Sequence, residues 1–180
     1  MLRNRRMLGN LIAVLTVWTV SGFSFFMLDF YVKYFPGSVF FNKALFGLVD
    51  AAGLFYIQFV QKFFKSVANM VRVTMVSTIL LCLLYTVAPL SFIPAVIALI
   101  RMQVNSMMSY GYHINQCLFP VLMRGTVFSL ANAVSRPFVA SAAIVAEYTS
   151  NPLIMVMIAS IICAFATFCI TEEDSSHLLG

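Results

Sequence analysis

Long apolar stretches, separated by short polar or proline-containing breaks, make up most of this chain. Six of them are long enough to cross a bilayer as helices, because about 20 residues span its hydrocarbon core. We predict spans at about 7–31, 40–63, 71–87, 92–118, 125–147 and 152–170. The breaks are short, so we expect neighbouring spans to pack as antiparallel hairpins in one bundle. This all-α membrane domain covers residues 1–171, and an acidic tail on the cytoplasmic side is predicted at 172–180.

The composition supports a multi-pass integral membrane protein. Of the 180 residues, 62% are hydrophobic and 9% are charged, which is more apolar surface than a soluble domain of this length can bury. The formal net charge is +5, but the basic residues flank the apolar spans, so lipid explains them better than nucleic acid. The four cysteines lack metal-ligand spacing, and no nucleophile–base pair or phosphate loop stands out. We therefore expect no enzyme activity, no cofactor, no metal and no nucleic-acid partner.

Lysine and arginine are distributed unequally between the two sides of the predicted membrane. One side carries Arg3, Arg5, Arg6, Lys62, Lys65, Arg72 and Arg124. The other side carries Lys33 and Lys43. Because cytoplasmic loops are enriched in lysine and arginine, we expect both termini on the cytoplasmic side. The plasma membrane is favoured as the location, with an organelle or the mitochondrial inner membrane as alternatives.

Charged side chains inside the spans are the informative exceptions, because an arginine near the bilayer centre costs about 2.5–3.5 kcal/mol. Asp50, Arg101 and Arg136 each fall near the middle of a predicted span. Opposite charges at that depth pair where geometry permits, so we expect Asp50 to be the counter-ion of one arginine. In the fourth span, Asn105 and Tyr112 share a helical face with Arg101.

The fifth span shows a second polar face. Phe128, Asn132 and Arg136 follow one another at four-residue spacing, which places them on one side of a helix. Pro137 directly follows the arginine, removes a backbone hydrogen bond and is expected to kink the helix there. This face, like that of the fourth span, is expected to line a wet cavity or to pack against polar partners.

Several of these residues also form recognisable motifs. Phe119-Pro120-Val121-Leu122-Met123-Arg124 has the pattern (Y/F)-P-x-x-x-R, and Phe46-Gly47-Leu48-Val49-Asp50 has the pattern F-G-x-x-D. In these motifs and their spacing the chain resembles the major facilitator superfamily, and within it the organic anion and cation transporters. The aromatic run of Trp18, Phe23, Phe25 and Phe26 is similar to that of the family's seventh helix. The resemblance covers nearly the whole chain and corresponds to the second half of a twelve-helix transporter.

The resemblance implies one half-bundle of the major facilitator fold and a substrate cavity within it. Arg136, twelve residues after Arg124, matches a cavity position that is basic in anion transporters. Arg101 matches a basic cavity position in the family's tenth helix. The residues expected to bind substrate are Arg136, Arg101, Asn132, Asp50, Asn105 and Tyr112. The arginines would attract a small organic anion, and the neutral side chains would orient it.

Two interpretations of function follow. In the first, the chain is a transporter half that moves a small organic anion by alternating access against a second six-helix bundle. A homodimer or a separate N-terminal half would supply that bundle, or the sequence is a fragment of a longer chain that contains it. In the second, a degenerate half-transporter is a structural subunit of a larger membrane complex. Departures from the family pattern motivate the second: Cys117 replaces a usual acid, Leu54 replaces a lysine of the anion transporters, and the loop at 65–69 is shortened.

Overall fold

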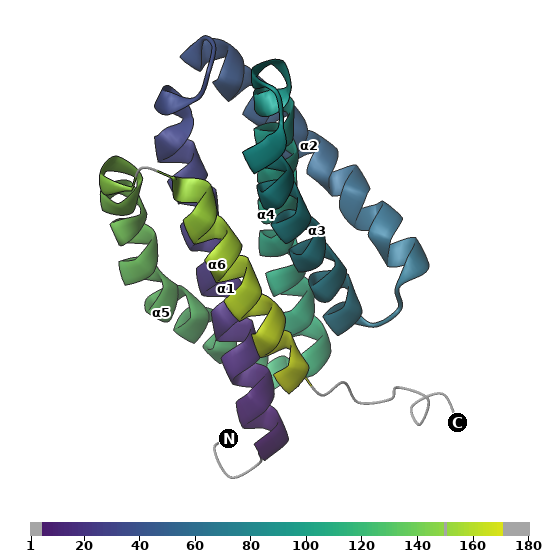
Figure 1. The fold of residues 1–180 in the computed structure, drawn as a ribbon. Coiled ribbons are helices and arrows are strands. Elements are labelled where there is room, and N and C mark those ends of the chain that lie inside the picture. The colour runs from purple at the N-terminus through teal and green to yellow at the C-terminus, as the bar shows by residue number, and fades with distance from the viewer. Residues whose placement is uncertain (1–4, 150, 171–180) are drawn as a thin grey trace.

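The computed structural model describes residues 5–149 and 151–170, and its long elements are all α-helices (Figure 1). They are α1 (Arg5–Tyr31), α2 (Val39–Phe63), α3 (Val67–Val87), α4 (Ile93–Leu118), α5 (Val121–Tyr148) and α6 (Pro152–Ala166). Short 3-10 turns are η1 (Val32–Tyr34), η2 (Leu90–Phe92) and η3 (Thr167–Cys169). Six helical segments, the last including η3, are long and apolar enough to cross a membrane, as the sequence predicts. The acidic tail at 172–180 and Arg3 lie outside the described residues.

Two helices begin four residues earlier than the sequence predicts. α5 starts at Val121, directly after Pro120, so the motif that ends at Arg124 is already helical from its third residue. The first turn closes when the Met123 amide donates to the Pro120 carbonyl at 2.8 Å. α3 starts at Val67 because the hydroxyl of Ser66, which precedes it, accepts a hydrogen bond from a backbone amide and caps the helix.

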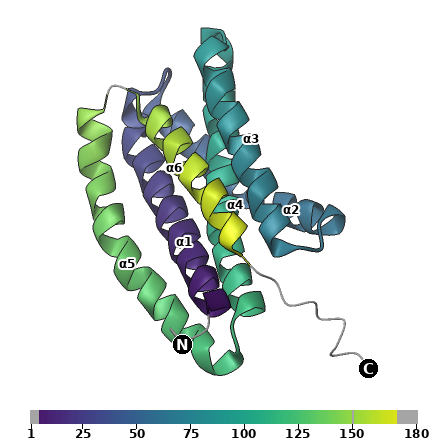
Figure 2. The ribbon, with the colours of Figure 1, turned by 60° about the horizontal axis from the view of Figure 1, so that its bottom comes forward.

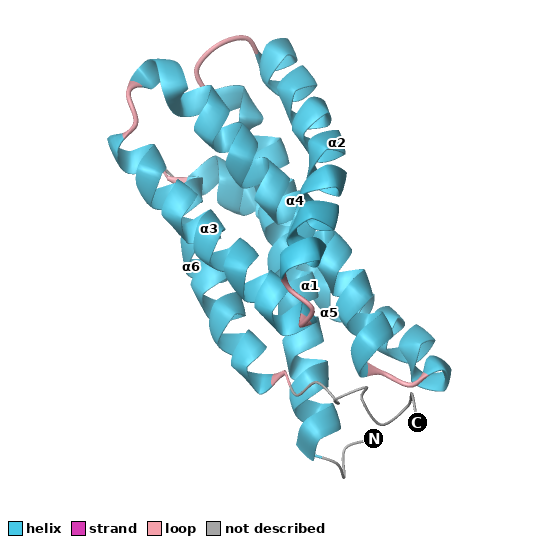
Figure 3. Cartoon of the chain, turned by 90° about the vertical axis from the view of Figure 1, so that its right-hand side faces the viewer, coloured by secondary structure: helices cyan, strands magenta, loops and turns pink. Residues whose placement is uncertain are grey.

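The loops gather at the two ends of the bundle (Figure 3). The start of α1, the α2–α3 and α4–α5 connections and the end of α6 share one of these ends (Figure 1). We call it the basic end, because it carries Arg5, Arg6, Lys62, Lys65, Arg72 and Arg124. Lys33 and Lys43 belong to the segments at the other end, the opposite end. The two groups of basic residues that the sequence places on different sides of the membrane are therefore separated in space.

The central helices of the bundle are α1 and α4. α1 packs against α4, α5 and α6, α4 packs against α1, α2 and α3, and α3 and α6 also pack on each other. If α1, α2 and α3 are exchanged with α4, α5 and α6, in that order, the same pairs of helices are in extensive contact. Because α1 and α4 run in opposite directions (Figure 1), the two three-helix halves are arranged as an inverted repeat.

The expectation that neighbouring spans form hairpins is wrong for most of the bundle. Only α3 packs extensively on the helix that follows it, which is α4, whereas α1 packs on α5 and α2 packs on α4. Complementary faces, not loop length, decide the pairing. Small residues on the buried face of α5, Ala131, Ser135 and Ala142, allow a close approach to α1. α5 is continuous through Pro137 and curves around α1 (Figure 2).

Candidate functional site

Arg101 lies in a fully bonded cluster between α1, α2 and α4. Its side chain is 4% exposed, and its Nε and Nη2 atoms donate to the two carboxylate oxygens of Asp50, each at 3.2 Å. Nη1 donates to the carbonyl oxygen of Phe25 at 2.7 Å, and the guanidinium carbon lies 3.4 Å from the centroid of the Phe25 ring. The predicted pairing of Asp50 with an arginine is therefore confirmed, and the partner is Arg101. Bidentate bonding and ring stacking hold this guanidinium at the same time.

Two residues that the sequence analysis did not assign to the site extend this cluster. Oδ1 of Asp29 lies 3.7 Å from Nη2 of Arg101 and 2.7 Å from Nζ of Lys43. Asn105 donates to the backbone carbonyl of Asp50 at 3.1 Å. The neutral cluster, as we call Asp29, Lys43, Asp50, Arg101 and Asn105, therefore holds two cations and two anions. Its charges cancel within the chain.

Arg136 lies in a different environment. Its side chain is exposed, about 22 Å along a helix that is about 42 Å long at 1.5 Å per residue. No hydrogen bond or ion pair joins it to any residue in the described part of the chain. At 100° per residue, Arg136 and Asn132 fall on one flank of the buried face of α5, and Val134 and Phe138 fall on the other. Arg136 is therefore an unpaired cation near the middle of its span.

Three aromatic rings from three helices lie beside Asn132. The centroids of Trp18 (α1), Tyr112 (α4) and Phe128 (α5) are 4.7 to 5.2 Å apart. Trp18 is buried, whereas Tyr112 is 49% exposed. The Trp18 ring lies directly on the backbone of α4, because a Cβ atom at Gly111 would be 2.6 Å from its Cε3 atom. Glycine at position 111 is thus required for this close approach.

A hydrogen bond from Trp18 determines what Asn132 presents. Nε1 of Trp18 donates to Oδ1 of Asn132 at 3.2 Å. An indole N–H can only donate, so the amide oxygen faces the indole and the amide NH2 group remains for another acceptor. The guanidinium of Arg136, one turn further along α5, carries only hydrogen-bond donors. We call Asn132 and Arg136 the donor pair, and this combination is suited to an anion.

The six residues predicted as one site therefore divide into two groups. Arg101, Asp50 and Asn105 belong to the neutral cluster. Asn132 and Tyr112 both contact Trp18, and Arg136 follows on the same flank of α5. Trp18 and Phe128 complete the second group, and the four-residue spacing of Phe128, Asn132 and Arg136 is the sequence signal for it. Nothing in the sequence signals that Asp29 lies opposite Arg101, because that contact depends on how α1 packs on α4.

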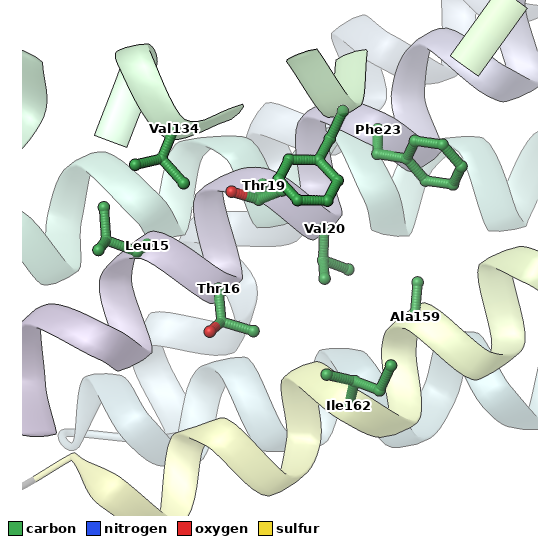
Figure 4. A pocket seen from close by; sticks show the side chains of 9 residues that line it. Leu15, Thr16, Thr19, Val20, Phe23, Val134, Ala159 and Ile162 are labelled. Carbon is green, nitrogen blue, oxygen red and sulfur yellow. The ribbon is translucent and has the colours of Figure 1, made fainter. Parts of the chain in front are cut away.

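A cavity of about 400 Å³ lies on the other flank of α5, between α1, α5 and α6 (Figure 4). Its lining is apolar apart from two hydroxyl groups, those of Thr16 and Thr19. The Thr16 hydroxyl already donates to the carbonyl oxygen of Ile12 at 2.9 Å. The cavity therefore offers no charge that would recognise an ionic substrate, and it is separate from the donor pair.

A cavity of about 540 Å³ at the opposite end is charged instead. Its lining includes Asp29, Lys33, Lys43 and Glu147. Glu147 is paired with Lys33 and accepts a hydrogen bond from the Tyr34 hydroxyl at 2.6 Å. Since α5 contributes residues from the flank that carries Arg136, this cavity lies on the same side of the bundle as the donor pair.

The sequence matches no protein-family model and no curated protein. Within residues 5–149 and 151–170, no group of three or more His, Cys, Asp or Glu side chains gathers as a metal site would require. The candidate site is therefore defined by its geometry: the donor pair, with Trp18, Tyr112 and Phe128 beside it.

Proposed function

We propose that the chain is half of a membrane transporter of the major facilitator type, which binds a small organic anion at the donor pair. The observation that supports this proposal most directly is Arg136 near the middle of α5, which is exposed and has no bonded partner among residues 5–149 and 151–170. Holding that charge in hydrocarbon costs about 2.5–3.5 kcal/mol. We therefore expect Arg136 to face a wet cavity, in which an anion gains charge-assisted hydrogen bonds from it.

The proposal assigns different roles to the two arginines. Arg101 gives its donors to Asp50 and to the Phe25 carbonyl, so we assign it to positioning α1, α2 and α4. Arg136 is the group that contacts the anion. Asn132 and the exposed ring of Tyr112 orient the bound molecule. The neutral cluster thereby holds the scaffold on which the donor pair is presented.

The arrangement of helices supports alternating access. Inverted three-helix repeats are found within each six-helix half of major facilitator transporters. α2 and α5 are the least buried spans, and a second six-helix bundle would cover them. A second copy of this chain or a separate N-terminal half would supply that bundle. From the basic residues, we assign the basic end to the cytoplasmic side of the membrane.

Uptake measurements test this function. Cells expressing the chain are compared with cells expressing Arg136→Gln or Arg136→Lys, using a panel of radiolabelled organic anions. We expect uptake to fall to background in Arg136→Gln and to be partly retained in Arg136→Lys, because lysine keeps the charge but not the forked geometry. Lys62→Gln, at the end of α2, is the matched control and should transport normally. Equal anion uptake by wild type and Arg136→Gln would contradict the proposal.

The second candidate function is a structural role in a larger membrane complex, and the surface of α2 favours it. This helix packs mainly on α4 and exposes a row of aromatic side chains: Phe40, Phe41, Phe55, Phe59 and Phe63. Such a face fits a neighbouring apolar helix as well as lipid. Purification in mild detergent distinguishes the two functions. A stoichiometric protein complex that forms equally with Arg136→Gln, together with no anion uptake, would favour the structural role.

A further inference from the structure

Among residues 5–149 and 151–170, the charges around the candidate site leave one positive charge without a counter-ion. The two cations of the neutral cluster, Arg101 and Lys43, are offset by its two carboxylates. Lys33 is offset by Glu147 at the opposite end. Arg136 remains, and the other base on α5, Arg124, lies about 18 Å away at 1.5 Å per residue and donates to the Phe119 carbonyl. One carboxylate neutralises the charge that this chain supplies, and a second would meet only cations of this chain that already have partners.

The donor pair also limits the shape of the anion. Side chains at i and i+4 on a helix have Cβ atoms about 5–6 Å apart, so the two oxygens of one carboxylate can accept from Asn132 and Arg136 together. The aromatic rings beside the pair are closely packed, and Tyr112 leaves half of its surface open. An aromatic ring attached to the carboxylate gains an offset or edge contact with Tyr112 and Phe128 at the usual 4.5–7 Å.

Building on the proposed function, we infer that the site is selective for monocarboxylates that carry an aromatic ring. Dicarboxylates are disfavoured because their second charge has no free cation to meet. Cations are disfavoured because the donor pair offers no acceptor and Arg136 repels them. Uncharged analogues lose the charge-assisted bonds that hold the carboxylate.

The chain carries its own reporter for this test, because Trp18 is the only tryptophan in the sequence. Its indole bonds to Asn132 and contacts Tyr112, so a ligand at either residue changes its emission. The full chain in lipid nanodiscs is titrated with benzoate, terephthalate, benzamide and benzylammonium, with excitation where these probes do not absorb. Retention of radiolabelled benzoate by the same nanodiscs gives an independent dissociation constant.

We expect saturable benzoate binding, with terephthalate, benzamide and benzylammonium each at least about tenfold weaker. Arg136→Gln should lose benzoate binding, and Lys62→Gln should keep it. Terephthalate binding as tightly as benzoate would overturn the selectivity for monocarboxylates while leaving an anion site at Arg136 in place. No saturable binding of any probe would overturn this inference alone. Equal binding of benzamide, or unchanged benzoate binding by Arg136→Gln, would overturn both this inference and the proposed function.

Discussion

Arg101 and Arg136 are both guanidinium groups well inside membrane-spanning helices, in α4 and α5. Arg101 is buried against Asp50, the Phe25 carbonyl and an aromatic ring. Arg136 is exposed and has no bonded partner in the described chain. The same side chain therefore stabilises the fold in one place and remains available in the other. What decides its role is whether the opposite charge is built into the same chain.

The largest effect that would separate the two arginines is on stability. Asp50→Asn leaves Arg101 buried beside only the more distant Asp29, so we expect the free energy of unfolding to fall by about 3 kcal/mol. Arg136→Gln should change it by less than about 0.5 kcal/mol, as is usual for exposed positions. Circular dichroism during denaturant titration in detergent micelles measures both. Wild-type stability of Asp50→Asn would remove the distinction.

A charge reversal at Arg136 tests the functional side of the same comparison. Arg136→Asp should weaken anion binding by at least about 2 kcal/mol, or about thirtyfold, because attraction becomes repulsion. Anion uptake should be abolished, and uptake of organic cations becomes favourable. The unfolding midpoint should stay at the wild-type value, which shows that the protein is still folded. Loss of stability together with uptake would instead assign Arg136 a structural role like that of Arg101.

Gly111→Ala tests whether Trp18 holds Asn132 in place. The added Cβ atom would lie 2.6 Å from the buried indole, and the ring must move away from Asn132. We expect a destabilisation of about 1–2 kcal/mol, a shifted Trp18 emission spectrum and weaker benzoate binding. Gly47→Ala is the matched control, because a Cβ atom there has no neighbour within 4 Å. Normal emission and binding in Gly111→Ala would show that the indole is not a positioning residue.

The smallest effect is expected at the Lys33–Glu147 pair. Both side chains are about half exposed, and exposed ion pairs contribute little to stability. Lys33→Gln should therefore leave the unfolding midpoint unchanged in the assay that detects Asp50→Asn. A loss comparable to that of Asp50→Asn would show that the charged cavity at the opposite end is as important to the fold as the neutral cluster.

The pattern of apolar residues was sufficient to predict six spans and their approximate limits. It did not predict which helices pack together, because a short loop constrains two ends without determining which faces interlock. The close α1–α5 contact depends on small residues such as Ala131 and Ser135, whose role is visible only against their neighbour.

The candidate site was predictable to a similar extent. Charges inside apolar spans identified Asp50, Arg101 and Arg136, and the expectation of one ion pair among them is confirmed. Their division into two groups depends on the depth and rotation of three different helices. The sequence does not point to Asp29 and Lys43, because a charge near the end of a span is ordinary in a membrane protein. Only the packing of α1 on α4 brings Asp29 to Arg101.

The inverted relation between the two halves makes the α2–α4 and α5–α1 contacts counterparts of each other. Each joins the second helix of one half to the first helix of the other. The first is fastened by an ionic bond between Asp50 and Arg101, and the second by an uncharged bond between Asn132 and Trp18. Because the indole and the amide stabilise the second contact without any charge, the nearby guanidinium of Arg136 is not needed for packing the helices together.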